Sequence, residues 1–152
     1  MIYIGVDPGA KGGIALVGSD GSAIAYPWDD DKFVSYMRTA TIMRDRDGEK
    51  LIAAVEKVGA VHGNGIVSSF SFGRSFGYIL GCLSAFAIPY QLVPPNVWKR
   101  EFSLIGKDKA ASIEVCKRLY PNINLLPTER CKKESDGMAE AVLIATHAKR
   151  HF

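Results

Sequence analysis

Short runs of apolar residues dominate the beginning of the chain. Residues 2–7, 12–18 and 21–26 are apolar or alternate between apolar and polar, and the glycine-containing segments "PGAKGG" and "SDGS" separate them. Such runs, with turn residues between them, are typical of strands joined by tight turns. We therefore expect a three-stranded antiparallel meander at the start of the fold.

Helical spacing follows the meander and then alternates with two further strands. Acidic residues at 29–31 precede an expected helix that ends by Gly48. Its expected apolar face contains Phe33, Tyr36, Met37 and Ile42. "KLIAAVEKV" predicts a fourth strand that ends at Glu56, and "PYQLVPP" predicts a fifth. This order of elements predicts an α/β fold with one five-stranded mixed sheet flanked by helices.

The remaining helices are expected at about 69–87, in a short turn after the two prolines at 94–95, at about 107–120, and from about 135 onward. The helix at 69–87 contains Gly77, Gly81 and Ala85, small residues that permit close packing. His147 and His151 lie four residues apart on the last helix, but no "HExxH" glutamate accompanies them. We therefore expect them on a fraying, exposed helix end rather than in a metal site.

Length and composition suit one well-filled core. With 152 residues, 47% of them hydrophobic, we expect a single domain over residues 1–152. No apolar run reaches the ~20 residues that a membrane-spanning helix needs, and "MIYIGVD" does not resemble a secretion signal. Three dispersed cysteines suit a reducing compartment and argue against a zinc ribbon. These features predict an intracellular protein without membrane contact.

Four acidic residues occupy positions that suggest chemistry. Asp7 and Glu56 end two expected central strands, while Asp136 and Glu140 lie four residues apart on the last helix. If the first and fourth strands are neighbours, all four can meet at one edge of the sheet. Such a cluster is unfavourable without compensating side chains, and Mg²⁺ or Mn²⁺ would stabilise it. Paired ions of this kind hydrolyse phosphodiesters.

Each acid also has a simpler explanation when it is considered alone. Asp7 can cap a turn, Glu56 can be an ordinary charge at a strand end, and Asp136 and Glu140 can lie on a solvated helix face. The order of the four acids along the chain favours the metal site.

Several segments together resemble RuvC-type Holliday-junction resolvases: "IGVDPG", "VEKV", "PPNVWKREF" with "GKDKAAS", and "SDGMAEAVLIA". The resemblance spans nearly the whole chain and is closest to the compact versions that bacteriophages carry. It implies an RNase H-like fold, a homodimer, and Mg²⁺-dependent symmetric nicking of branched DNA. Four-way junctions are the implied substrate, with forks and flaps as further candidates. The implied location is the cytoplasm of a phage-infected bacterial cell.

The four acids do not match the catalytic positions of the family equally well. Asp7, Glu56 and Glu140 match acidic catalytic positions of the family. Asp136 matches less cleanly, because the bacterial cellular enzymes usually place the last two acids three positions apart, whereas here the spacing is four. Glu134 therefore remains an alternative to Asp136 as the fourth metal ligand.

Basic residues concentrate in the last third of the chain. Residues 1–95 hold 8 Lys or Arg against 9 Asp or Glu, whereas residues 96–152 hold 11 against 7. This asymmetry suits a polyanionic partner, although a solvated helix surface explains it equally well. The resemblance implies DNA contact most directly for Lys107 and Lys109. Further candidates for DNA contact are Lys99, Arg100, Arg74 and His62, with Arg130, Lys132 and Lys133 as weaker ones.

Other functions remain open from the sequence. A phosphotransferase of the sugar-kinase and actin type also begins with Asp followed by glycines, but it needs a second such hairpin and a larger second lobe. An RNase H-like nuclease acting on RNA or on an RNA–DNA hybrid would share the fold and the metal chemistry. A non-catalytic junction-binding module would leave all four acids without a role.

Overall fold

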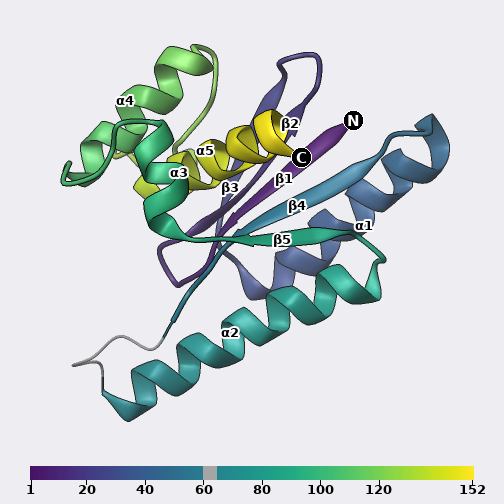
Figure 1. The fold of residues 1–152 in the computed structure, drawn as a ribbon, viewed down its shortest axis with the longest axis horizontal. Coiled ribbons are helices and arrows are strands. Elements are labelled where there is room, and N and C mark those ends of the chain that lie inside the picture. Colours follow the sequence, from purple (N-terminus) through teal and green to yellow (C-terminus); the bar gives the residue numbers. More distant parts are fainter. Residues whose placement is uncertain (60–64) are drawn as a thin grey trace.

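A five-stranded mixed sheet forms the centre of the computed structural model, which describes residues 1–59 and 65–152 (Figure 1). The strands β1 (Ile2–Asp7), β2 (Gly13–Gly18) and β3 (Ala23–Pro27) form an antiparallel meander. β4 (Leu51–Glu56) pairs in parallel with β1, and β5 (Tyr90–Val93) pairs in parallel with β4. The order β3-β2-β1-β4-β5 confirms the predicted fold class, including the meander.

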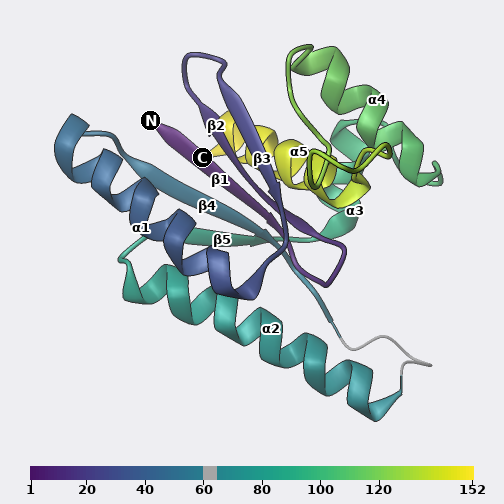
Figure 2. The ribbon, with the colours of Figure 1, turned by 180° about the vertical axis from the view of Figure 1, so that it is seen from behind.

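Helices cover both faces of this sheet (Figures 1 and 2). α1 (Asp30–Asp47) and α2 (Ile66–Ala85) lie on one face. α5 (Asp136–His151) packs directly on the other face, and α3 (Pro95–Glu101) and α4 (Lys109–Leu119) pack against α5. The result is a three-layer arrangement with a hydrophobic core on each side of the sheet.

Alternation along the strands divides the apolar side chains between these two cores. Ile4, Val6 and Val55 pack with residues of α1 and α2, such as Phe33 and Leu83. Ala15, Val17 and Ala54 pack instead with α5 and with Trp98 of α3. The side of the sheet to which each strand residue points therefore follows directly from its register.

The first helix begins and ends as its sequence predicts. The Asp29 side chain accepts hydrogen bonds from the backbone N–H groups of Asp31 and Lys32, which caps the N-terminus of α1. Gly48 follows the last turn with φ of 67°, a left-handed conformation that favours glycine.

The end of α5 differs from the sequence prediction. Every residue from 137 to 148 is buried except Glu140, and His147 is only 6% exposed. The prediction of a fraying, exposed helix end is therefore wrong for His147, although His151 is exposed. The physical reason is that the sheet covers α5 on one side while α3 and α4 cover it on another.

α2 buries much less of its surface than its apolar composition suggests. Only Ile79 and Leu83 are fully buried. A Cβ atom added to Gly77 or Gly81 would meet no atom within 4 Å in the described part of the chain, so these glycines do not serve close packing there. Among the described residues, no helix is both long enough and apolar enough to span a membrane.

Candidate active site

Two carboxylates lie side by side at one edge of the sheet. Asp7 ends β1 and Glu56 ends β4, and these parallel strands are in register with Val6 opposite Val55. Val6 and Val55 point into the core beneath α1 and α2. Because successive side chains of a strand alternate, Asp7 and Glu56 point to the opposite face, where α5 lies.

The first turn and a half of α5 adds two more carboxylates. The hydroxyl oxygen of Ser135 accepts a hydrogen bond of 3.2 Å from the N–H of Met138, which caps the helix immediately before Asp136. Asp136 and Glu140 are four residues apart and so share one helix face. Asp136 and Glu140 line the same cavity as Asp7, so this face is turned toward the sheet edge.

Glycine residues allow α5 to approach the sheet closely at this point. A Cβ on Gly5 of β1 would stand 2.0 Å from the carbonyl oxygen of Ala141, and a Cβ on Gly137 would stand 2.0 Å from that of Lys11. No larger residue fits at either position without displacing backbone. The approach sets the distance between Asp7 and the acids of α5. Sequence reasoning missed these glycines, because a close contact between distant segments leaves no local pattern.

A cleft of about 360 Å³ opens above these acids. Asp7, Asp136 and Glu140 line it, together with four lysines: Lys11, Lys99, Lys107 and Lys109. Glu56 does not line the cleft. Its carboxylate accepts a hydrogen bond of 3.1 Å from the indole N–H of Trp98 instead. The cleft thus combines negatively and positively charged side chains.

Two of the lysines neutralise part of the acidic cluster. Lys109 Nζ lies 2.9 Å from Asp136 Oδ2, and Lys99 Nζ lies 3.6 Å from Glu140 Oε1. The hydroxyl of Ser112 also donates to Glu140 Oε1 at 3.1 Å. The cluster therefore has compensating side chains, whereas the sequence pattern predicts four acids that a metal ion alone would stabilise. Sequence reasoning had placed Lys99 and Lys109 on DNA only, and it gave no role to Ser112 or Trp98.

Asp7 has the most strongly raised pKa of the four acids. Burial is the main cause that raises its pKa, and Glu56 and Glu140 raise it further, so that it reaches about 8 although Lys99 acts in the opposite direction. Burial also raises the pKa of Glu56, against the opposing hydrogen bond from Trp98. Burial is thus the main reason that both carboxyl groups resist ionisation, and a nearby cation would offset this cost.

The donor set suits a hard divalent cation. All four acids offer carboxylate oxygens, which Mg²⁺ and Mn²⁺ prefer, and buried acids with raised pKa values gain from a nearby cation. No three of these four acids have oxygens that all lie within 4.8 Å of one another in the part of the chain that the structure describes. Asp136 and Glu140 are held by lysines instead, so these two side chains would have to leave their partners to share an ion.

The two candidates for the fourth acid lie in different surroundings. Asp136 lines the cleft. Glu134 accepts a hydrogen bond of 2.9 Å from Lys117 Nζ and lies outside the residues that line the cleft. This placement favours Asp136.

Only some of the residues expected to contact DNA line the cleft. Lys99, Lys107 and Lys109 line the cleft, whereas Arg100 is exposed and does not. Arg74 lies 3.9 Å from Asp30 and lines a neighbouring cavity that shares only Gly9 with the cleft. His62 lies outside the described residues.

Comparisons with known proteins identify the fold. No protein-family model matches the chain, and no curated protein matches it by sequence. The structure is similar to that of Thermus thermophilus RuvC in complex with a Holliday junction substrate, with a TM-score of 0.59 and 14% identity over 97% of this chain and 92% of that one. It is also similar to a second Thermus thermophilus RuvC structure, with a TM-score of 0.55 and 18% identity over 97% and 93% of the two chains. The chain therefore has the fold of RuvC, of the RNase H-like type that the family resemblance implied.

Proposed function

We propose that the protein is a divalent-metal-dependent endonuclease that resolves Holliday junctions and other branched DNA by symmetric phosphodiester hydrolysis. The observation that carries this proposal is the placement of Asp7, Asp136 and Glu140 in one lysine-lined cleft, with Glu56 at the neighbouring strand end. The RuvC fold supports it, because one of the similar RuvC structures contains a Holliday junction substrate.

The four acids would hold Mg²⁺, and Mn²⁺ would substitute for it. When bound, such ions activate a water molecule and stabilise the leaving oxygen of the phosphodiester. Trp98 and Ser112 orient two of the ligands by donating hydrogen bonds to Glu56 and Glu140. In this proposal they are positioning residues, since each acts through the carboxylate that it contacts.

The lysines of the cleft would bind the DNA backbone. Lys107 lines the cleft and is exposed, and the side chain of Lys109 is 76% exposed although it contacts Asp136. An exposed ammonium group can exchange a carboxylate partner for a phosphate at small cost. Such an exchange would bring DNA into the cleft and free Asp136 for the cation.

Paired, symmetric nicks require two active sites related by a two-fold axis. We propose that a second copy of the chain packs against α2. Ile66, Val67 and Phe70 of this helix are 89%, 82% and 74% exposed, and the neighbouring glycines at 73, 77 and 81 face open space. Water is an unfavourable environment for an apolar helix face of this kind, and a two-fold contact would cover it.

A nicking assay on a panel of substrates tests the activity. The panel contains a four-way junction, a flap, a fork, a linear duplex and an RNA–DNA hybrid, each with Mg²⁺, with Mn²⁺ or with a chelator. We expect paired nicks in the four-way junction that depend on the metal. Asp7→Asn should bind the junction without cutting it, while Asp20→Asn, a change at an exposed turn, should cut like the parent protein.

Other outcomes would point to the remaining hypotheses. Cleavage restricted to the RNA–DNA hybrid would indicate a ribonuclease, and junction binding without cleavage by the parent protein would indicate a binding module. Undiminished nicking by a folded Asp7→Asn variant would contradict the assigned active site.

A further inference from the structure

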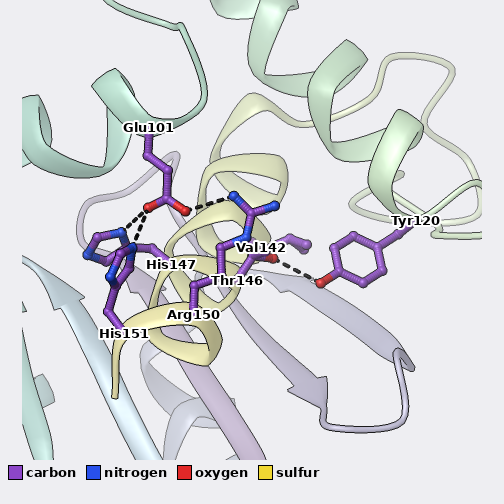
Figure 3. Close-up of polar contacts among 7 residues, drawn as sticks. All are labelled: Glu101, Tyr120, Val142, Thr146, His147, Arg150 and His151. Carbon is purple, nitrogen blue, oxygen red and sulfur yellow. Dashed lines mark hydrogen bonds and ion pairs between the residues drawn. The ribbon is translucent and has the colours of Figure 1, made fainter.

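Two histidines and a glutamate meet near the C-terminal end of α5 (Figure 3). His147 and His151 lie on successive turns of α5, and Glu101 is the last residue of α3. One ligand atom of each residue lies within 4.8 Å of the other two, and no other group of three His, Cys, Asp or Glu side chains meets this condition among residues 1–59 and 65–152. His147 follows Glu140 by seven residues, or about 10 Å along the helix axis. The cluster is therefore separate from the proposed nuclease site.

Both imidazoles direct a nitrogen at the same carboxylate oxygen. His147 Nδ1 contacts Glu101 Oε2, and His151 Nε2 lies 3.2 Å from that oxygen. The two ring centroids are 4.5 Å apart. The guanidinium of Arg150 donates to the other oxygen, Glu101 Oε1, at 2.7 Å. Arg150 thus orients the carboxylate and leaves Oε2 to the histidines.

The surroundings are closed on one side and open on the other. The ring of Phe152 meets His147 edge-on at a centroid distance of 6.0 Å, and Arg150 lies over the ring of Phe102 at 5.1 Å. The side chain of His147 is 8% exposed, whereas that of His151 is 52% exposed. An ion can therefore reach the three ligand atoms from the His151 side, where water can complete its coordination.

The chemistry of the three ligands selects the ion. Two imidazole nitrogens with one carboxylate oxygen are typical ligands of Zn²⁺, whereas Mg²⁺ prefers oxygen alone. Ligand atoms at ~2.0–2.2 Å from a tetrahedral ion lie roughly 3.3 Å from one another. The separation of 3.2 Å between His151 Nε2 and Glu101 Oε2 fits this geometry, whereas His147 Nδ1 lies closer to that oxygen and would have to move away from it to share an ion. We propose that Glu101, His147 and His151 bind one Zn²⁺ ion, with water as the fourth ligand.

Such an ion would join two helices that both contribute to the cleft. α3 carries Trp98 and Lys99, which contact Glu56 and Glu140, and α5 carries Glu140 itself. Cross-linking the end of α3 to α5 would fix these side chains relative to one another. The proposed role of the zinc ion is therefore structural, and its binding does not depend on the nuclease assignment.

Calorimetric titration of the metal-free protein with Zn²⁺ tests the site. Millimolar Mg²⁺ is present throughout to occupy the carboxylate site of Asp7, Glu56, Asp136 and Glu140. We expect one Zn²⁺ per chain, and the same site should give Co²⁺ the absorption spectrum of a tetrahedral complex. His151→Gln changes a side chain that is 52% exposed, and it should weaken binding by at least about tenfold, since loss of even an outer-shell contact has an effect of this size. Glu101→Gln should do the same.

Two matched variants control for other zinc ligands. His62→Gln removes the only remaining histidine, and Cys131→Ser removes a partly exposed thiol. Both should bind Zn²⁺ like the parent protein, and Zn²⁺ should raise their melting temperature by more than it raises that of His151→Gln. Failure of the parent to bind Zn²⁺ would overturn the proposal and leave a cluster held by hydrogen bonds alone. Unchanged affinity in both His151→Gln and Glu101→Gln would also overturn it.

Discussion

Gly137 of α5 lies directly against Gly12 of the β1–β2 turn: a Cβ atom on Gly137 would stand 2.7 Å from the Cα of Gly12. It would also stand 2.0 Å from the carbonyl oxygen of Lys11. Asp136 precedes Gly137 in sequence, and the turn begins immediately after Asp7. This contact between backbones therefore sets the position of one carboxylate of the cleft relative to the other.

Gly137→Ala should destabilise the protein, because the added methyl group meets backbone atoms that cannot move independently. We expect a loss of about 1–3 kcal/mol or more in the free energy of unfolding, measured by denaturant titration, together with reduced nicking. Gly59→Ala is the control, since no atom of residues 1–59 or 65–152 lies within 4 Å of the added atom. It should change stability by no more than about 0.5 kcal/mol. Equal effects of the two changes would contradict the close approach.

The raised pKa of Asp7 predicts how stability depends on pH in the metal-free protein. The folded protein holds this proton up to about pH 8, whereas the unfolded chain releases it near 3.8. Between these values the folded state binds more protons than the unfolded state, so stability falls as pH rises. Asp7→Asn removes this loss and should flatten the fall.

Thermal unfolding in a chelator measures this effect. Near pH 8, each tenfold difference between the proton affinities of the folded and unfolded states corresponds to about 1.4 kcal/mol of stability. For a chain of this size, that is a difference of about 3–6 °C in the melting temperature. We expect Asp7→Asn to gain at least this much. Asp20→Asn should gain nothing, because hydrogen bonds from Ser22 lower the pKa of Asp20. If the stability of Asp7→Asn and of the parent protein depended on pH in the same way, the raised pKa of Asp7 would be contradicted.

The lysines that follow α3 should dominate the salt dependence of DNA binding. Changing Lys107 and Lys109 together to Ala should weaken junction binding and reduce the slope of log affinity against log salt by about 2, because two fewer counterions are released. Arg46→Ala with Lys50→Ala removes the same charge near the start of β4, at the opposite end of the sheet from Glu56. This pair should leave the slope unchanged. An unchanged slope in the lysine variant would place the DNA path elsewhere.

Glu140 and Glu134 provide a direct comparison of acids inside and outside the cleft. In the parent protein, Mg²⁺ at about 100 times its dissociation constant should add about 2.7 kcal/mol to the free energy of unfolding. Glu140→Gln should lose most of this gain and most of the nicking. Without Mg²⁺ it should be no less stable, because relief of repulsion with Asp7 and Glu56 offsets the lost ion pair with Lys99.

Glu134→Gln should retain both the response to Mg²⁺ and the nicking, since this side chain contacts Lys117 outside the cleft. Asp136→Asn should behave like Glu140→Gln. If Glu134→Gln lost both properties while Asp136→Asn kept them, the fourth ligand would be Glu134.

The exposed face of α2 should mediate dimer formation. Gly77→Arg places a long charged side chain where the single chain offers open space, so it should preserve the fold but block the approach of a second copy. Light scattering should show a dimer for the parent protein and a monomer for this variant. Thr39→Arg adds the same charge at an exposed position of α1 and should remain dimeric. A parent protein that is monomeric both alone and with junction DNA would contradict the proposed dimer.

Local patterns in the sequence determined the helices and strands and their order along the chain. Alternation marked the meander, and helical spacing with capping residues marked α1. An acid directly after each of two buried strands placed Asp7 and Glu56 at strand ends. These features depend on residues within a few positions of one another, which is why the sequence displays them. The i and i+4 spacing likewise showed that Asp136 and Glu140 share a helix face.

Only the tertiary structure decided which charges meet. Glu101 and His147 are 46 residues apart, and Trp98 and Glu56 are 42 apart, so no periodicity connects either pair. The same holds for the lysines that contact Asp136 and Glu140, and for Glu134, which turns to Lys117. Burial of the α5 end and exposure of α2 also depend on how the helices pack on the sheet. Packing brings together side chains from distant segments, and their charge, burial and pKa values follow from that proximity rather than from their local sequence.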